Sequence, residues 1–152
     1  MSTESTRLEG TRVLITGGTS GLGRAMAAAL VHAGAQVVLT GRDRARAEAA
    51  AAAIGAVGIE LDVRSKRSVE TGVRAVYAEL GGVDVLVNNA GIGMRTVNPR
   101  FMTDPRPFWE VSPEGFVNVV ATKLTGSFLV SRAVVPRMLE AGGGRVVMIS
   151  MN

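Results

Sequence analysis

The segment from residue 16 to residue 23, which reads Thr-Gly-Gly-Thr-Ser-Gly-Leu-Gly, has the composition of a phosphate-binding loop. Gly17 would allow a sharp turn off a strand, Gly21 would let backbone N–H groups approach a pyrophosphate, and Gly23 would permit close packing of a helix on a sheet. A helix that begins at this point directs its unpaired N–H groups and the positive end of its dipole at an anion. The segment therefore predicts a dinucleotide phosphate site, with a purely structural glycine turn as the alternative.

Short apolar runs alternate with helical patterns along the chain, and this alternation places the glycine segment between a strand and a helix. The apolar runs predict strands at residues 13–15, 37–39, 59–61, 83–87 and 146–149. Helical spacing, capping residues and glycine stops predict helices at residues 21–33, 43–53, 65–80 and 112–140, the last bent at Pro136. The expected fold class is α/β, a Rossmann-type doubly wound parallel sheet in one domain that spans residues 1–152.

Residues 92–112 interrupt the alternation, because three prolines disfavour a long regular element: Pro99, Pro105 and Pro107. Large apolar side chains of the same segment include Met94, Phe101, Phe108 and Trp109. These side chains could form an apolar wall for a ligand, but we expect them to pack on their own domain. A fifth strand at residues 146–149 would be a sheet edge with unpaired hydrogen-bonding groups, so we expect the domain to be truncated after that strand.

Composition and charge exclude several function classes. Of the 152 residues, 47% are hydrophobic, which is enough for a core, and the absence of cysteine excludes disulfides and thiolate sites, so no metal is expected. The net charge of +4 comes from scattered basic residues, and aromatic residues make up only 4%, so we expect no nucleic-acid binding. No run approaches 18 consecutive apolar residues and residues 1–10 lack the apolar core of a signal peptide. We therefore expect a cytoplasmic protein without membrane contact.

Four motifs occur in the order typical of one known family. Residues 16–23 match its T-G-x-x-x-G-x-G motif, Asp62-Val63 follows the third strand, Asn88-Asn89-Ala90-Gly91 closes the fourth, and residues 144–150 are similar to its G-R-I-V-x-I-S. Over residues 8–152 the sequence thus resembles the short-chain dehydrogenase/reductase family. The resemblance implies the strand order 3-2-1-4-5 and an NAD(P)-dependent oxidoreductase, which transfers hydride between the nicotinamide and a small-molecule alcohol or carbonyl substrate.

The resemblance also implies which residues contact the cofactor. Asp62 would contact the adenine, Asn89 would contact the cofactor directly, and Gly91 would let the chain pass close to the nicotinamide ribose. Taken alone, Asp62 could merely cap a turn, and residues 88–89 could be a plain strand-ending turn. The complete expected set is Thr16, Gly17, Thr19, Ser20, Gly21, Leu22, Gly23, Arg42, Asp62, Val63, Asn89, Ala90 and Gly91.

The choice between NADP and NAD depends on the end of the second strand, roughly 20 residues after the glycines. Gly41 stands where NAD-preferring relatives tend to carry an acid, and Arg42 can pair with a phosphate through two N–H groups. We expect NADP to be preferred. NAD is the alternative, in which Arg42 is a surface residue and Asp43 binds the ribose, although Asp43 is also a good helix N-cap. Ser20 stands where NADP-preferring members often carry an arginine.

The family's catalytic residues are an Asn, a Ser and a Tyr-x-x-x-Lys pair, and this chain departs from each of them. Lys123 stands at the Asn position, and Ser150 lies one residue before the Ser position, which Met151 occupies. Tyr77 is the only tyrosine and lies in the third expected helix, while the family's Tyr-x-x-x-Lys would fall beyond Asn152. Lys123 and Ser150 are therefore the catalytic candidates, and we expect the isolated 152-residue chain to be inactive.

Two other functions stay open alongside hydride transfer. The changes at residues 123 and 151 favour a non-catalytic dinucleotide-binding or interaction module with a degenerate active site. A family member with different chemistry, such as isomerisation or elimination, is the third possibility. The resemblance further implies a homo-oligomer that associates through the helix beginning near Pro113.

Overall fold

A parallel five-stranded sheet forms the centre of the computed structural model, which describes residues 8–150. The strands run over Arg12–Ile15 (β1), Gln36–Gly41 (β2), Val57–Glu60 (β3), Val85–Asn88 (β4) and Arg145–Met148 (β5). Their order is β3-β2-β1-β4-β5, and every neighbouring pair is parallel. The prediction of a doubly wound parallel sheet of order 3-2-1-4-5 is confirmed.

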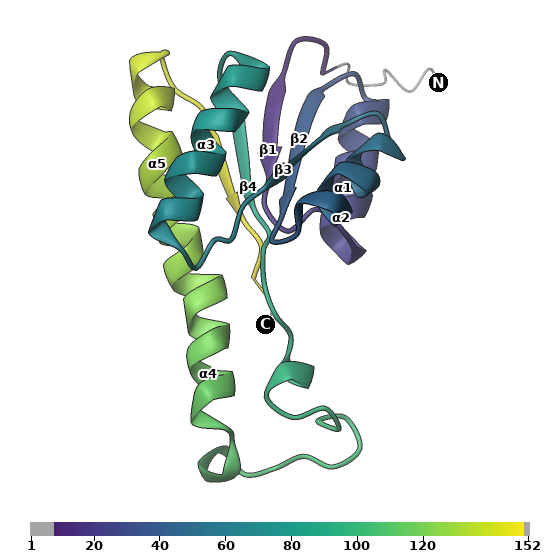
Figure 1. Cartoon of the computed structure of the whole chain (residues 1–152), viewed down its shortest axis with the longest axis vertical. Coiled ribbons are helices and arrows are strands. Elements are labelled where there is room, and N and C mark those ends of the chain that lie inside the picture. Colours follow the sequence, from purple (N-terminus) through teal and green to yellow (C-terminus); the bar gives the residue numbers. More distant parts are fainter. Residues whose placement is uncertain (1–7, 151–152) are drawn as a thin grey trace, which may run out of the picture.

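Helices cover both faces of the sheet (Figure 1). They run over Gly21–His32 (α1), Arg44–Ala52 (α2), Lys66–Leu80 (α3), Pro113–Val120 (α4) and Gly126–Glu140 (α5). Side chains alternate along each strand, so Val13 and Ile15 of β1 pack with α1 and α2, whereas Leu14 packs with α3 and α5. All three side chains are completely buried, as expected for a strand with helices on both faces.

The third and fourth strands differ from their predicted bounds. β3 begins at Val57 rather than at residue 59, because Val57 already pairs with Val38 of β2. The strand ends at Glu60, so the buried Leu61 lies just beyond it. β4 begins at Val85 rather than at residue 83, because its pairing with β1 begins at that residue. The apolar runs located these strands correctly but not their ends.

The long helix expected at residues 112–140 contains an irregular turn. Residues Ala121–Thr125 form a π-helical turn between α4 and α5, whereas α5 passes through Pro136 without interruption. Around this turn, the Thr122 hydroxyl donates to the Asn118 carbonyl at 2.8 Å and the Ser127 hydroxyl donates to the Lys123 carbonyl at 2.7 Å. Such hydroxyl bonds to carbonyls one turn back distort helices. The sequence predicts an irregularity at Pro136 only, so the turn at residues 121–125 is an additional feature of this helix.

The continuous helical stretch Pro113–Glu140 is long and apolar enough to cross a membrane by length and composition, although it contains no uninterrupted apolar run of that length. A single helix of this kind is a weak indication of a membrane, because core helices of soluble proteins have the same length and composition. Its C-terminal half contacts the core through Val130, Val134 and Met138.

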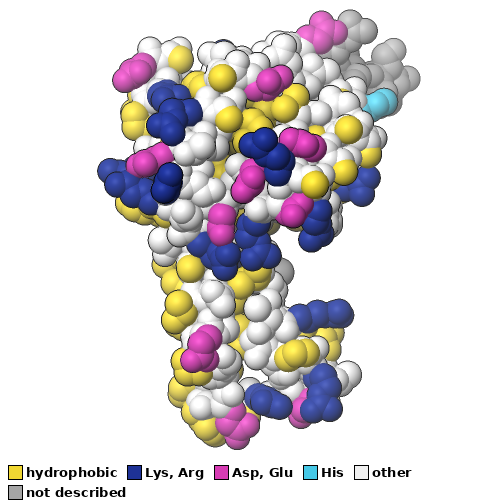
Figure 2. Space-filling model, viewed as in Figure 1, with side chains coloured by type: hydrophobic (Ala, Val, Ile, Leu, Met, Phe, Trp, Pro, Cys, Tyr) yellow, Lys and Arg dark blue, Asp and Glu magenta, His cyan; other side chains and the backbone are white. Residues whose placement is uncertain are grey.

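The same helical stretch carries an exposed apolar stripe, which consists of Phe116, Val117, Leu124 and Phe128. Figure 2 shows hydrophobic side chains gathered along this edge of the molecule.

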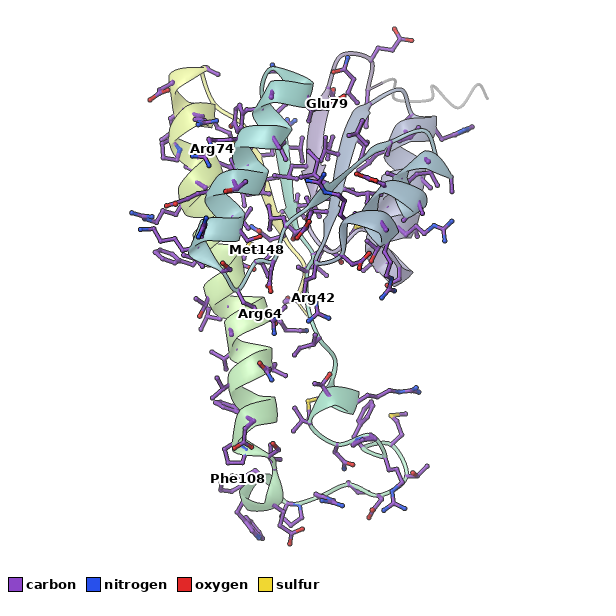
Figure 3. The ribbon with its side chains drawn as sticks, viewed as in Figure 1. Arg42, Arg64, Arg74, Glu79, Phe108 and Met148 are labelled. Carbon is purple, nitrogen blue, oxygen red and sulfur yellow. The ribbon has the colours of Figure 1, made fainter. Side chains whose placement is uncertain are left out.

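Residues 92–112 extend away from the sheet together with α4 (Figure 1). Phe108 and Trp109 lie in a short 3-10 turn, Phe108–Glu110, where their rings pack edge to face with centroids 5.3 Å apart. Their side chains are 82% and 73% exposed. They therefore do not pack on the domain as we expected, and Figure 3 shows Phe108 far from the ends of the strands.

An ion pair between Arg12 and Asp84 connects β1 to the start of β4 at the amino ends of these strands. Arg12 donates to Asp84 through its backbone N–H at 2.8 Å, Nε at 2.9 Å and Nη2 at 2.8 Å. These hydrogen bonds from Arg12 hold the pKa of the Asp84 carboxyl below its usual value, although partial burial raises it. The pair joins β1 to the residue that precedes β4, so it connects segments that are 72 residues apart.

We expect Asp84→Asn to lower the free energy of unfolding by about 1 to 2 kcal/mol at pH 7, because charge-assisted bonds to a half-exposed carboxylate are lost. Because the folded pKa of Asp84 is depressed, its stabilisation is present above the unfolded value of about 3.9 and disappears as pH falls through the folded value. Urea unfolding at pH 7 and near pH 3 measures both effects. Glu79→Gln, on an exposed part of α3, is the matched control. If the difference in free energy of unfolding between Asp84→Asn and wild type is as large near pH 3 as at pH 7, the stabilising role of the ionised Asp84 carboxylate is contradicted.

Candidate dinucleotide site

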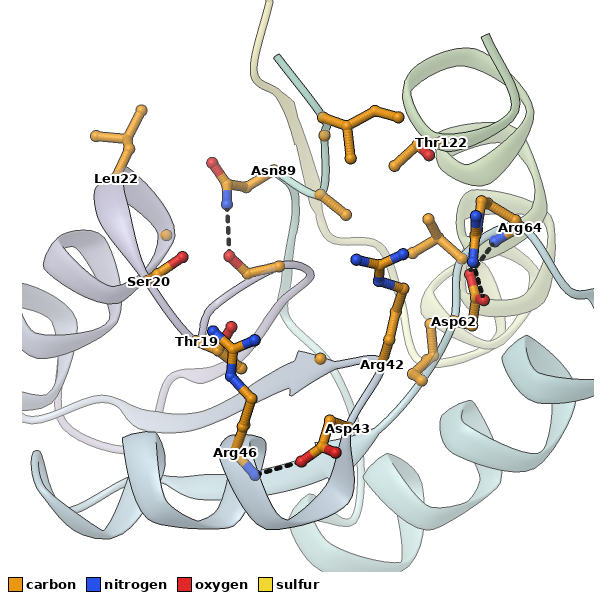
Figure 4. Close-up of a pocket in the computed structure, with 18 residues that line it drawn as sticks. Thr19, Ser20, Leu22, Arg42, Asp43, Arg46, Asp62, Arg64, Asn89 and Thr122 are labelled. Atoms are coloured by element: carbon orange, nitrogen blue, oxygen red, sulfur yellow. Dashed lines mark hydrogen bonds and ion pairs between the residues drawn. The ribbon is translucent and has the colours of Figure 1, made fainter. Parts of the chain in front are cut away.

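The carboxyl ends of β1, β2, β3 and β4 surround a cavity of about 620 Å³ (Figure 4). The strand order reverses between β1 and β4, and open α/β sheets bind ligands in the crevice outside such a point. The volume lies in the usual range for small-molecule sites. The lining residues are Gly17, Thr19, Ser20, Leu22, Gly23, Gly41, Arg42, Asp43, Arg46, Leu61, Asp62, Val63, Arg64, Asn89, Ala90, Gly91, Ile92 and Thr122.

Gly17, in the loop between β1 and α1, and Gly23, in the first turn of α1, have no room for a side chain. Gly17 has a φ of 66°, and a Cβ atom there would lie 2.7 Å from the Cα of Ala90. A Cβ atom at Gly23 would overlap the Gly17 carbonyl oxygen and the Asn89 side-chain nitrogen. The glycines therefore let the loop lie directly against the end of β4, as the sequence predicts for close packing of helix and sheet.

Thr16 and Asn89 fasten this loop to β4. The Oγ1 atom of Thr16, which is 1% exposed, accepts the backbone N–H groups of Asn89 and Ala90, both at 3.1 Å. In return the Asn89 Nδ2 atom donates to the carbonyl oxygens of Thr16 at 3.1 Å and Gly17 at 3.0 Å. Asn89 thus shapes the loop with its amide nitrogen as well as lining the cavity.

The amino end of α1 is open to a ligand. Ser20 occupies its N-cap position but accepts no hydrogen bond from the helix, and the first turn contains no acidic residue. By contrast, side chains cap the other helices that begin after a loop: Asp43 caps α2, Ser65 caps α3 and Ser112 caps α4. The first N–H groups of α1 and the positive end of its dipole are therefore available to an anion.

Arginine side chains lie along the part of the cavity below β2. Arg42 follows β2, and Arg46 lies in the first turn of α2; Figure 4 shows both side chains reaching toward the cavity. Within residues 8–150, neither guanidinium makes a hydrogen bond or an ion pair. Between them, Asp43 accepts the Arg46 backbone N–H at 2.8 Å and thereby caps α2. The cavity thus offers to an anionic group two guanidinium groups that make no ion pair within the described chain.

The structure brings most of the predicted cofactor residues to one cavity. All of them line it except two, Thr16, which lies behind the loop, and Gly21, which begins α1. Lys123 lies in the π-helical turn, and its Cε atom is 3.0 Å from where a Cβ on Gly91 would stand, so the absence of a side chain at Gly91 makes room for Lys123. Ser150 is exposed and follows the end of β5, while Met151 lies outside the described residues.

Seven lining residues lie outside the expected set: Gly41, Asp43, Arg46, Leu61, Arg64, Ile92 and Thr122. Gly41 and Asp43 were considered only for the choice between NADP and NAD, and the other five were not predicted. Arg64 and Ile92 directly follow predicted residues, so extending each motif by one position would have found them. Arg46 lies one turn after Arg42, a spacing that a helix beginning at residue 44 places on the same side. Thr122 reaches the cavity because of the π-helical turn, which helical spacing alone does not predict. Within the described chain, no group of three or more metal-binding side chains is present.

The parallel sheet, the glycine loop and the cavity at the reversal of strand order define a Rossmann-type nucleotide-binding domain. The family model for short chain dehydrogenases matches residues 11–152, and the chain belongs to that family. It is 38% identical over 146 residues to a D-threitol dehydrogenase from Mycolicibacterium smegmatis, covering 93% of this chain and 52% of the relative. It is 35% identical to a 3-oxoacyl-(acyl-carrier-protein) reductase from Aquifex aeolicus, covering 95% of this chain and 56% of the relative.

A solved structure gives the same result. A 3-ketoacyl-(acyl-carrier-protein) reductase from Brucella melitensis, complexed with NADH, matches with a TM-score of 0.78 and 37% identity. The match covers 89% of this chain and 52% of that protein. The chain thus spans about half the length of the relatives it matches.

Proposed function

We propose that this chain binds a nicotinamide dinucleotide in the cavity at the ends of β1 to β4. The observation that carries the proposal is the glycine loop, which lies against β4 and presents the uncapped end of α1 to the cavity. The family membership and the NADH complex of the Brucella melitensis relative support the same class of cofactor. The pyrophosphate would lie at the amino end of α1, with the adenosine toward β2 and β3 and the nicotinamide toward Gly91.

We propose further that NADP is preferred over NAD. Gly41 carries no acid that would repel a 2′-phosphate, and the unpaired Arg42 and Arg46 side chains supply positive charge beside it. Asp43 caps α2 through its side chain, which favours its structural role over a role as ribose ligand. The N–H groups at the amino end of α1 would thus bind the pyrophosphate, and the two arginines would bind the 2′-phosphate.

Calorimetric titration of the 152-residue chain with NADPH and with NADH tests both proposals. We expect NADPH to bind with a dissociation constant about tenfold or more below that of NADH, because one additional charge-assisted phosphate contact is made. Equal dissociation constants would contradict the NADP preference, and no heat with either ligand would contradict the proposed function.

The reaction that we propose for the whole protein is hydride transfer between the nicotinamide and an alcohol or carbonyl carbon of a small-molecule substrate. The bound cofactor supplies the hydride donor or acceptor, and the residues described above bind and orient it. Lys123 beside Gly91 and Ser150 after β5 are the proposed catalytic positions in this chain. Tyr77, the only tyrosine, is followed by Ala-Glu-Leu-Gly and donates toward the Val134 carbonyl at 3.4 Å, away from the cavity. We therefore expect no turnover from the 152-residue chain alone.

The exposed apolar stripe of Phe116, Val117, Leu124 and Phe128 supports a homo-oligomer, since contiguous apolar surface marks contact sites. We propose that this stripe packs against a second copy instead of a membrane, and that the protein acts in the cytoplasm. We expect sedimentation to show a dimer or larger assembly and Leu124→Glu to shift it toward the monomer. Leu22→Glu, which alters an exposed leucine outside the stripe, is the control. A monomeric wild type, or association unchanged in Leu124→Glu, would contradict this surface.

A further inference from the structure

Asp62 and Arg64 form an ion pair in the wall of the cavity beyond β3 (Figure 4). The Asp62 Oδ1 atom accepts from the Arg64 backbone N–H and from its Nε atom, both at 3.0 Å. The Oδ2 atom accepts from the Arg64 Nη2 atom at 2.8 Å. Both side chains remain partly accessible, 28% for Asp62 and 32% for Arg64, so a ligand in the cavity can reach them.

These bonds leave the Asp62 carboxylate with one free hydrogen-bond acceptor position. An ionised carboxylate accepts roughly four hydrogen bonds, about two at each oxygen. Arg64 occupies both acceptor positions of Oδ1 and one position of Oδ2, so a single acceptor position on Oδ2 remains. The Arg64 hydrogen bonds also keep the pKa of the Asp62 carboxyl below its usual value, against the effect of partial burial, and the nearby charge of Arg42 acts in the same direction.

The pair does not serve to join distant parts of the fold. Arg12 and Asp84 make the same arrangement of a backbone bond and two guanidinium bonds, but they connect segments 72 residues apart. Asp62 and Arg64 are two residues apart, and a backbone bond alone would already close that turn. The additional guanidinium bonds fix the orientation of a carboxylate that faces the cavity, which is an arrangement suited to a ligand with one hydrogen-bond donor.

We propose that Arg64 is a positioning residue that makes Asp62 select an amino-bearing purine at the adenosine end of the site. This inference rests on the proposed dinucleotide function. The 6-amino group of adenine donates a hydrogen bond to the remaining position on Oδ2. Hypoxanthine has a 6-oxo group at the position of the amino group, and its nearest donor, N1–H, lies one ring position away. A carboxylate that Arg64 holds in place cannot move to that donor, so its acceptor stays unpaired, and sites built to bind a donor reject analogues that lack it at that position.

The test compares NADPH with its hypoxanthine analogue in wild type, Arg64→Ala, Asp62→Ala and the double variant. We expect wild type to prefer NADPH by roughly tenfold and Arg64→Ala to reduce that preference to about two- to threefold, because the carboxylate loses its fixed orientation. In the Asp62→Ala background, Arg64→Ala should change the ratio no further. Arg67→Ala, an exposed arginine of α3 outside the cavity, is the matched control.

The possible outcomes separate the two proposals. The role of Arg64 would be overturned, with dinucleotide binding left intact, if Arg64→Ala did not change the ratio of the two dissociation constants. Equal losses of affinity for NADPH and for the hypoxanthine analogue would give that result. A further change in the double variant would also overturn it, because Arg64 would then act independently of Asp62. Failure of the wild-type chain to bind either ligand would refute the proposed function itself.

Discussion

Replacement of Gly23 by alanine is expected to abolish measurable dinucleotide binding and to lower the free energy of unfolding by about 2 to 4 kcal/mol. The new methyl group would overlap the Gly17 carbonyl oxygen and the Asn89 side-chain nitrogen. Those two atoms are joined by a hydrogen bond of 3.0 Å that holds the loop against β4, so relief of the overlap must break it. The displaced loop would no longer present the amino end of α1 to the cavity.

Gly93→Ala is the control for this experiment. Gly93 has a φ of −83°, and a Cβ atom there meets nothing within 4 Å, so the same substitution should leave stability and binding unchanged. Calorimetric titration with NADPH and urea unfolding measure the two properties. A Gly23→Ala variant with wild-type affinity would contradict the assignment of this loop to the phosphates.

Arg42→Ala is expected to raise the dissociation constant of NADPH by roughly 10- to 100-fold, which is the usual weight of one or two charge-assisted bonds to a phosphate. NADH lacks the 2′-phosphate, so its dissociation constant should change by about threefold or less. The Arg42 side chain reaches into the cavity, and within the described chain it makes no ion pair with an acidic side chain.

Arg44→Ala is the matched control for Arg42→Ala. Arg44 is only two residues away and also exposed, but it lies outside the large cavity and its Nε atom is 3.7 Å from a Glu60 carboxylate oxygen. Removal of this arginine changes the net charge equally and should affect NADPH and NADH alike. Equal losses of NADPH and NADH affinity in Arg42→Ala would refute the role of Arg42 in cofactor choice.

The sequence was sufficient for the sheet and for the phosphate loop because both depend on local patterns. Val13-Leu14-Ile15 reads as a buried strand since both faces are covered, and the glycines after it mark the turn that brings the loop against Ala90. The end of the third strand was misplaced because strand bounds depend on pairing with β2, which begins at Val57. Local apolar runs carry no information about that pairing.

Three features of the site depend on the folded geometry and were therefore missed. Arg64 looks like an ordinary surface arginine until its contacts with Asp62 are seen. The amide of Asn89 contacts Thr16, which is 73 residues earlier in the chain. The π-helical turn at residues 121–125 brings Thr122 to the cavity, although none of these five residues is a glycine or a proline.

The measurement that tests the central claim most directly is an NMR titration of the ¹⁵N-labelled 152-residue chain with NADPH. Binding in the cavity predicts that the backbone amide shifts concentrate in the segments 17–23, 41–46, 61–64 and 89–92, which come together only in the folded sheet. Amides of the exposed 3-10 turn Phe108–Glu110 should not move, since that turn lies far from the cavity (Figure 3). Shifts confined to residues outside the four segments, or no shifts at saturating NADPH, would contradict the assignment of this cavity as a dinucleotide site.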